Sequence, residues 1–170
     1  MIGLNYLGKM GQLGNQMFQY AALKGIANNR GLEYTVPNHK EVLEDGLGNK
    51  LRIELYDAFD ISPKNQGLLP TNEYVQEAHF HFDPDLYNEC PDNCSVVGFF
   101  QTEKYFVNIR DQIVKDFKVK KEYRDDCKSI LKQFHHPIAL HIRRGDFLIN
   151  SLNHYNPVSY THLTLPTTGV

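Results

Sequence analysis

In the first 36 residues, short apolar runs flank a stretch with helical spacing, and this pattern is compatible with few folds. Residues 2–7 are a short apolar run ending at Gly8, residues 15–30 carry apolar side chains at helical spacing, and residues 32–36 form a second apolar run. A strand, a glycine turn, a helix and a second strand make a βαβ unit, whose two strands lie parallel in one sheet. The sequence therefore predicts an α/β fold built on a parallel sheet.

Further strands and helices are expected along the chain, in the alternation typical of a Rossmann-like domain. They are a short helix at 41–44, a buried strand at 95–100, helices at 103–117 and 121–134, and a strand at 138–142. The apolar side chains of the helix at 121–134, which are Tyr123, Ile130 and Leu131, are expected to face inward.

Composition excludes several classes of protein. Hydrophobic residues make up 41% of the chain and charged residues 22%, which allows a packed core. The net charge of -2 carries no basic excess, so nucleic acid is not expected as a partner. Three cysteines, an odd number, favour a reducing setting. We expect a cytoplasmic protein, since neither a signal peptide nor an apolar run of membrane-spanning length is present.

The first polar cluster is the glycine turn that precedes residues 15–30. Glycines at 8, 11 and 14 match neither the dinucleotide fingerprint nor the Walker loop. A glycine turn that enters a helix lets backbone N–H groups approach a polar ligand, and Asn15 and Gln16 would add side-chain amides. Gly11, Gly14, Asn15 and Gln16 are therefore candidate ligand-binding residues. The alternative is a purely structural turn capped by Asn15.

The second polar cluster follows the strand expected at 138–142. Arg143 and Arg144 stand in the segment His141–Asp146, and paired guanidinium groups suit the oxygens of a diphosphate. A fixed guanidinium would stabilise the charge that builds on a departing β-phosphate, so both arginines are candidate catalytic residues. Asp146 could orient an arginine, and His141 could bind the backbone or the ligand. The alternative is a buried structural Arg–Asp pair.

The segment from His79 to Asp83 allows two interpretations. Its alternation places His79 and His81 on one strand face, where they could join Asp83 in a metal site or simply form an exposed surface. The exposed surface is the prediction, and no metal ligands are assigned.

Three segments together resemble one enzyme family. They are GQLGNQMFQYA at 11–21, GFFQTEKYF at 98–106 and HIRRGD at 141–146. In this order and spacing they resemble the α-1,2-fucosyltransferases, glycosyltransferase family 11, over residues 1 to about 160. The resemblance implies inverting transfer of L-fucose from GDP-fucose to the 2-hydroxyl of a galactose-terminated glycan, without a metal or other cofactor.

The resemblance also implies a GT-B-type fold, in which one domain faces the acceptor and the other binds the donor. Residues 1–135 would form the Rossmann-like, acceptor-side domain, and residues 136–160 the start of the donor-binding domain. Arg143 would contact the β-phosphate of GDP-fucose, supported by Arg144 and His141, while the turn at Asn15 would line the cleft opposite. The complete enzyme would associate peripherally with a membrane.

The C-terminal end departs from the family pattern. Only 24 residues follow Asp146, whereas even one βαβ unit takes about 30. Residues 161–170 resemble a non-native tail, so we expect a fragment, truncated at the start of the second domain, with little activity of its own.

Other functions remain open on the sequence. An α-1,6-fucosyltransferase or a protein O-fucosyltransferase would carry a related arginine motif. A non-catalytic glycan-binding module would use exposed aromatic side chains and not the arginines. A nucleotide-binding domain unrelated to sugars is disfavoured by the glycine spacing.

Overall fold

A computed structural model describes residues 1–46 and 48–139 of the chain. Residues 1–133 form one compact unit, and a second unit begins at Phe134. The division into domains at residue 135 stays a prediction. Within the described residues, no helix is both long and apolar enough to cross a membrane.

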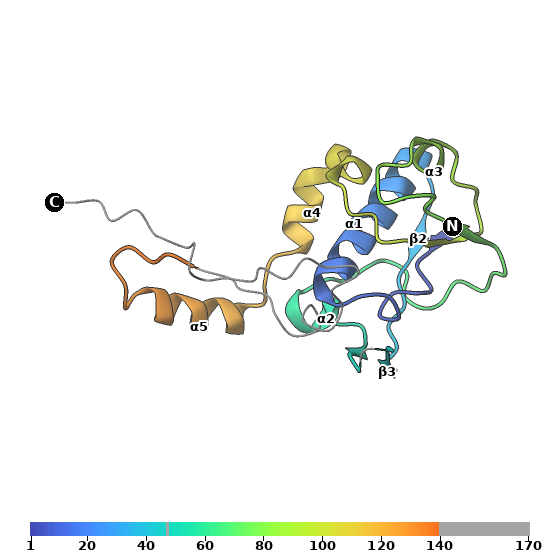
Figure 1. Ribbon diagram of the computed structural model, residues 1–170. Helices are drawn as coiled ribbons and strands as arrows, with labels where there is room; N and C mark the ends of the chain where they lie inside the picture. The colour runs from blue at the N-terminus through green and yellow to red at the C-terminus, as the bar shows by residue number, and fades with distance from the viewer. Residues whose placement is uncertain (47, 140–170) are drawn as a thin grey trace, which may run out of the picture. The chain divides into compact units, whose positions relative to one another are not determined.

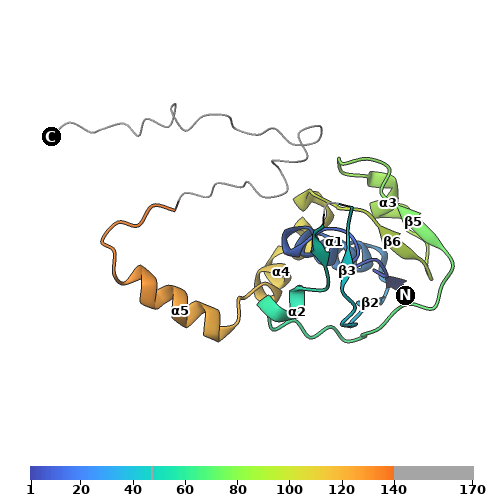
Figure 2. The same ribbon diagram turned by 60° about the horizontal axis from the view of Figure 1, so that its bottom comes forward.

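The first unit is built on a parallel sheet (Figure 1). Its strands are β1 (Ile2–Gly3), β2 (Tyr34–Thr35), β5 (Tyr74–Gln76) and β6 (Ser95–Val97), in the order β2-β1-β6-β5. Every neighbouring pair is parallel, with Ile2 opposite Tyr34, Gly3 opposite Ser95 and Val75 opposite Val96. Figure 2 shows β5 and β6 side by side. The parallel sheet with flanking helices confirms the predicted α/β class, while the GT-B assignment stays a prediction.

Two crossovers run in the same direction along this sheet. One leads from β1 through α1 (Leu13–Arg30) to β2, and the other from β5 through α3 (Pro84–Glu89) to β6. Because such crossovers are right-handed, both helices are expected on the same face of the sheet. The contact between α1 and α3 agrees with this expectation (Figure 1).

Helix α1 is the central element of the core. Several of its apolar residues, among them Leu23 and Ile26, are fully buried. The helix ends where Gly31 adopts a left-handed conformation, φ 65°, and donates its N–H to the last turn. At Gly25 an added Cβ would collide with the carbonyl oxygen of Tyr105, so this glycine is required by close packing against the segment that follows β6.

The segment expected to be one helix at 103–117 is broken into three pieces. They are η1 (Glu103–Tyr105), η2 (Val107–Ile109) and α4 (Arg110–Asp116). The Tyr105 side chain is fully buried, and its backbone lies against α1 at Gly25, which holds the first turn away from a continuous helix. The apolar stripe is still used, since Ile109 and Ile113 pack against Ala21.

The predicted helix at 41–44 is wrong. These residues lead into an antiparallel pair, β3 (Leu43–Glu44) with β4 (Lys50–Leu51), followed by the short helix α2 (Leu55–Ala58). The Asp45 carboxylate accepts hydrogen bonds from the backbone and side-chain N–H groups of Asn49 and so closes the hairpin loop.

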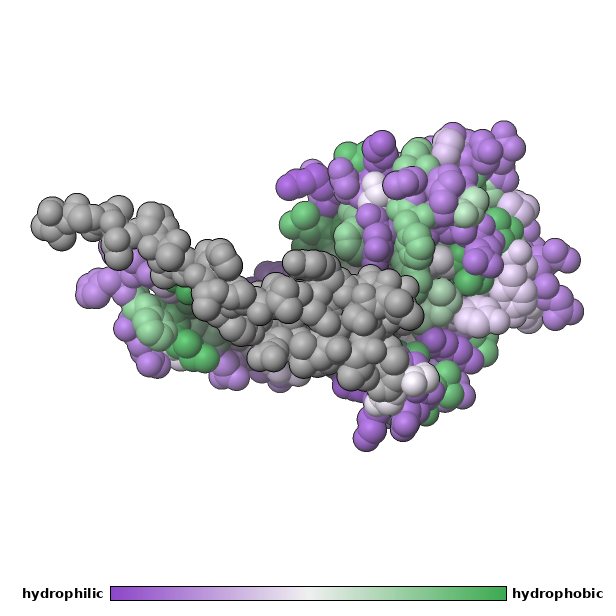
Figure 3. Space-filling model, in the orientation of Figure 1, coloured by the Kyte–Doolittle hydropathy of each residue, from purple (hydrophilic) through white to green (hydrophobic). Residues whose placement is uncertain are grey.

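Helix α5 (Lys121–Leu131) forms as predicted, but its apolar stripe does not face inward. Tyr123, Ile130 and Leu131 are 46%, 57% and 52% exposed, and hydrophobic residues are visible on this helix in Figure 3. Helical periodicity indicates which side chains share a face, but not whether anything packs on that face. The strand expected at 138–142 lies mostly outside the described residues.

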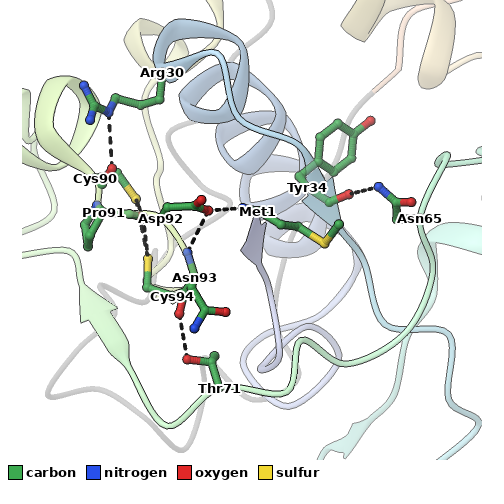
Figure 4. Close-up of polar contacts among 10 residues, drawn as sticks. All are labelled: Met1, Arg30, Tyr34, Asn65, Thr71, Cys90, Pro91, Asp92, Asn93 and Cys94. Carbon is green, nitrogen blue, oxygen red and sulfur yellow. Dashed lines mark hydrogen bonds and ion pairs between the residues drawn. The ribbon is translucent and has the colours of Figure 1, made fainter.

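The amino-terminal edge of the sheet is fastened by local polar contacts (Figure 4). The N-terminal ammonium of Met1 pairs with Asp92, and Thr71 donates its hydroxyl to the carbonyl oxygen of Asn93 at 2.7 Å. Beside them the sulfur atoms of Cys90 and Cys94, both buried free thiols, lie 3.7 Å apart. These contacts at the amino-terminal edge are therefore structural.

Candidate functional site

The candidate site lies at the carboxyl edge of the parallel sheet. Besides the segment after β2, three segments leave the sheet there: the glycine turn after β1, the segment 77–83 after β5, and the segment 98–102 after β6. In parallel α/β sheets, ligands bind beyond the carboxyl ends of the strands. The first and third segments belong to two of the motifs found in the sequence.

The glycine turn needs two of its glycines for conformation. Gly8 and Gly11 have φ angles of +79° and +74°, which side chains other than glycine rarely adopt. An added Cβ at Gly11 would also collide with the Asn15 side chain, so Asn15 covers Gly11. Gly14 differs, because a Cβ there would meet nothing within 4 Å among the residues that the structure describes. Packing within that part of the chain therefore does not explain Gly14.

The start of α1 is already supplied with a negative charge. The Glu54 carboxylate accepts a hydrogen bond of 2.7 Å from the backbone N–H of Leu13, in the first turn of the helix. A carboxylate at a helix N-terminus takes the position that an anionic ligand would otherwise occupy. The alternative in which Asn15 caps this helix is wrong, since the cap residue is Gln12 and the carboxylate comes from Glu54.

Gln16 is a structural residue and does not reach the surface. Its side chain is fully buried and donates to the carbonyl oxygens of Arg52 at 2.7 Å and Gly11 at 3.3 Å. Its side-chain oxygen accepts from the backbone N–H of Glu54 at 2.8 Å. Gln16 thus fixes the glycine turn against the segment that carries Glu54, and it has no group left for a ligand.

Gln19 fastens the glycine turn to the segment after β6. Its side-chain nitrogen donates to the carbonyl oxygens of Met10 at 3.2 Å and Gly98 at 3.0 Å. The side chain is almost fully buried, and within the described residues its oxygen has no hydrogen-bond partner. Sequence reasoning overlooked this residue, although a glutamine between Phe18 and Tyr20 in an apolar helix is itself a signal of a buried polar contact.

The Asn15 side chain, unlike that of Gln16, is only partly buried. Its side-chain oxygen accepts a 2.8 Å hydrogen bond from the exposed side chain of Gln101. The bond joins the glycine turn to the segment after β6. A half-exposed pair of amides offers both donors and acceptors, which suits the hydroxyl groups of a sugar.

Glu77 was also overlooked by sequence reasoning, and it organises the segment after β6. One oxygen of its buried carboxylate accepts from the backbone N–H groups of Phe99 and Phe100, at 3.1 and 2.9 Å. The other accepts from the Tyr105 hydroxyl at 3.1 Å, and that hydroxyl accepts from the backbone N–H of Asp83 at 2.9 Å. Burial raises the pKa of Tyr105 above its ordinary value, so the hydroxyl stays protonated and donates to Glu77.

Phe100 has an unusual backbone conformation within this network. Its φ angle is +51°, and its side chain is fully buried. Such a conformation at a residue other than glycine costs free energy and persists only where the surroundings enforce it. Here Glu77 holds the backbone N–H and the core holds the ring.

The segment 79–83 is a bent loop and not a strand. His79 and His81 are exposed, and their ring centroids lie 5.7 Å apart. Asp83 caps α3, accepting from the backbone N–H of Leu86 at 2.9 Å and of Ala78 at 3.2 Å. Among the described residues, no group of three or more His, Cys, Asp or Glu side chains could hold a metal ion.

The arginine motif lies outside the described residues. His141, Arg143, Arg144 and Asp146 therefore keep the roles predicted for them from the sequence, as predictions.

Comparison with known proteins identifies the family. The family model described as glycosyl transferase family 11 matches residues 1–159. The chain belongs to glycosyltransferase family 11. The match spans both polar clusters and the segment 98–106, so it includes the glycine turn and the Glu77-bound segment whose geometry is described above.

The curated relatives of this family 11 chain are sugar transferases. A galactoside α-(1,2)-fucosyltransferase 1 from Sus scrofa is 26% identical over 81% of the chain and 38% of its own length. A galactoside α-(1,2)-fucosyltransferase 2 from Mus musculus is 25% identical over 86% of the chain and 42% of its own length. An α-1,2-colitosyltransferase from Escherichia coli is 24% identical over 82% of the chain and 54% of its own length.

The chain thus spans about two fifths to one half of the length of these relatives. No solved structure matches this family 11 chain significantly.

Proposed function

We propose that this family 11 chain belongs to a galactoside 2-α-L-fucosyltransferase. The enzyme transfers L-fucose from GDP-fucose to the 2-hydroxyl of a galactose in a glycan. The galactose 2-hydroxyl gives up its proton, and its oxygen forms a bond to the fucose anomeric carbon with inversion. The bond from that carbon to the β-phosphate oxygen breaks, and GDP leaves. The observation that carries the proposal is the family match over residues 1–159, together with α-1,2-fucosyltransferases among the relatives.

The charges at the site support acceptor binding by the described unit. Glu54 places a carboxylate at the start of α1, which disfavours a phosphate there. Asn15 and Gln101 offer neutral amides, which suit sugar hydroxyls. In this proposal Gly14 lets the acceptor approach the helix start, where a side chain would stand in its way.

The donor side of the proposal rests on the arginine motif. Arg143 binds the β-phosphate, where a guanidinium stabilises the charge that develops as GDP leaves. Arg144, His141 and Asp146 support it. The proposed reaction needs no metal, so excess chelator is expected to leave the rate unchanged.

An activity assay with matched variants tests this proposal. The 170-residue chain and any longer product of its reading frame are incubated with GDP-fucose and lactose, and the product linkage is determined. We expect α-1,2 transfer from the longer product and little from the chain alone.

Arg143→Ala is expected to lower kcat by 100-fold or more, on the order of an oxyanion-type contact, and Arg143→Lys to recover part of it. A longer product that transfers fucose in α-1,6 linkage, or to protein hydroxyl groups, would overturn the proposal.

A second candidate is transfer of colitose. The Escherichia coli colitosyltransferase is as similar to this chain as the fucosyltransferases are, and the match covers more of its length. Side-by-side assays with GDP-fucose and GDP-colitose distinguish the two, because the preferred donor has the higher kcat/KM. A glycan-binding module without activity would bind galactosides equally well with Arg143 or with alanine at that position.

The proposal places the enzyme in the cytoplasm, in peripheral association with a membrane. The odd number of cysteines supports a reducing compartment. Fractionation of expressing cells tests both points.

A further inference from the structure

Two aromatic side chains from different segments lie together at the carboxyl edge of the sheet. The rings of Phe80 and Phe99 are nearly parallel, with 20° between their planes and 6.1 Å between their centroids. The Phe80 side chain is 70% exposed, and that of Phe99 is half-buried. We call this pair the aromatic platform. Single exposed apolar residues are ordinary, but here one largely exposed ring is stacked on a half-buried one, which gives a joint apolar contact surface.

Phe80 is held in place although it is exposed. Two residues further on, Phe82 packs inward, with its ring centroid 5.0 Å from that of Tyr105 and 5.4 Å from that of Tyr87. Asp83 then caps α3. The loop is thus anchored directly after Phe80, and the exposure of this ring does not come from a loose segment.

Phe99 is fixed by its backbone. Its N–H donates to the Glu77 carboxylate, and the carbonyl oxygen of the preceding Gly98 accepts a hydrogen bond from the Gln19 side chain of α1. An added Cβ at Gly98 would lie 2.7 Å from the Cβ of Glu77, so this close approach requires glycine. The next residue, Phe100, has the enforced φ of +51°. A surface fixed in advance loses little conformational entropy when it binds a ligand.

Polar groups border the aromatic platform. His79 and His81, on either side of Phe80, are exposed. Gln101, two residues after Phe99, is bound to Asn15 of the glycine turn. An apolar surface with hydrogen-bonding groups at its border suits a ligand that has one apolar face and several hydroxyl groups.

We infer that the aromatic platform binds the galactose unit of the acceptor glycan, an inference that rests on the proposed function. In galactose the C–H groups at C3, C4 and C5 form one apolar face, which can stack on an aromatic ring. The equatorial 2-hydroxyl projects from the ring edge and stays free to react. His79, His81 and the Asn15–Gln101 pair are positioned for the hydroxyl groups around it.

The platform is tested by binding without the donor, so that the result does not depend on activity. The 170-residue chain is titrated with methyl β-D-galactoside and lactose, followed by saturation-transfer NMR and by ligand-detected affinity. We expect weak binding, in the millimolar range that is ordinary for single sugars, with the strongest saturation at the protons on C3, C4 and C5. Methyl β-D-glucoside, in which an equatorial hydroxyl at C4 replaces the C–H group of this apolar face, serves as the sugar control.

Matched variants separate the platform from general effects. Phe80→Ala is expected to weaken galactoside binding about tenfold, the size of one aromatic contact, while Phe80→Tyr keeps most of it. Tyr123→Ala, which removes an aromatic ring that is 46% exposed on α5 of the same unit, is expected to change nothing. Equal binding by wild type and Phe80→Ala overturns the inference, as does the absence of galactoside binding by the wild-type chain.

The outcomes also distinguish this inference from the proposed function. If galactoside binding depends on Phe80 but the enzyme transfers no sugar to galactose, the inference about the platform holds and the proposed function is wrong. If the enzyme transfers fucose to lactose and Phe80→Ala does not change the KM for lactose, the proposed function holds and the inference about the platform is wrong.

Discussion

The Glu77 carboxylate accepts a hydrogen bond from the backbone N–H of Phe100, at 2.9 Å, and so ties the end of β5 to the segment that follows β6. The same oxygen accepts from Phe99. These two residues belong to the motif shared with family 11, whereas Glu77 lies outside all three motifs. Glu77, which no sequence motif singles out, therefore fixes the conformation of a segment that does belong to a motif.

Replacing Glu77 by alanine is expected to destabilise the chain strongly. Two backbone N–H groups and the Tyr105 hydroxyl would lose their acceptor, so the free energy of unfolding should fall by about 3 kcal/mol or more. Glu77→Gln keeps an acceptor oxygen and should cost about 1 kcal/mol. Urea unfolding followed by circular dichroism measures both. The control is Glu73→Ala, exposed at the approach to β5, with an expected change within about 0.5 kcal/mol. Equal stability of Glu77→Ala and Glu73→Ala would show that the network is not needed.

Two glycines of α1 are expected to respond in opposite ways to alanine. Alanine normally stabilises a helix interior relative to glycine by about 1 kcal/mol. Gly14→Ala should stabilise by less than about 1 kcal/mol, because Gly14 lies in the first turn of α1 and no described residue lies near the added Cβ. Gly25→Ala should instead destabilise by about 2 kcal/mol or more, since the Cβ would collide with the Tyr105 backbone. Thermal unfolding of the two variants measures the difference.

Gly14→Ala also tests the site. If the acceptor approaches the start of α1, this variant should raise the KM for lactose in an active longer product while keeping full stability. An unchanged KM would remove Gly14 from the proposed site.

Alanine substitutions of the neighbouring amides Asn15 and Gln16 are expected to lower the stability of the chain by different amounts. Gln16→Ala removes bonds to Arg52, Gly11 and Glu54 from a fully buried position and should cost about 2–3 kcal/mol of stability. Asn15→Ala removes one bond to an exposed partner and should cost less than about 1 kcal/mol. The measurement is chemical unfolding of both variants. A larger loss for Asn15→Ala than for Gln16→Ala would contradict the assigned roles.

The Asp83 cap is expected to make stability depend on pH in the acid range. The backbone hydrogen bond from Leu86 lowers the pKa of Asp83 below its ordinary value of 3.8, with a further contribution from Ala78. Because the folded-state pKa is the lower one, the carboxylate stabilises the fold fully above about pH 3.8. That contribution is lost as the pH falls below 3.8 through the folded-state pKa.

Asp83→Asn provides the matched comparison for this pH effect. Asparagine still caps a helix but cannot titrate, and it has one acceptor oxygen in place of two. Urea unfolding midpoints of wild type and variant are expected to differ at pH 7 and to converge as the pH falls below 3.8. A difference that stays constant down to pH 3 would show that the carboxylate charge contributes nothing.

The βαβ unit and the family could both be read from the sequence, because the information for each is local. Helical spacing at 15–30 and the apolar runs on either side fix α1 between β1 and β2 within 36 consecutive residues. The glycine turn is likewise contiguous, and Gly8 and Gly11 are glycines for a conformational reason that the sequence pattern already suggests.

Only the tertiary structure decided which polar residues shape the site and which can reach a ligand. Asn15 and Gln16 are both amides and neighbours in the sequence. The Gln16 side chain is buried and donates to the backbone carbonyl of Arg52, whereas the Asn15 side chain accepts from the exposed Gln101. Glu54 and Glu77 reach their partners across 41 and 23 positions of the chain, so no local pattern announces them. Periodicity likewise placed the apolar stripe of α5 on one face, but whether a face is buried depends on the elements that pack against it.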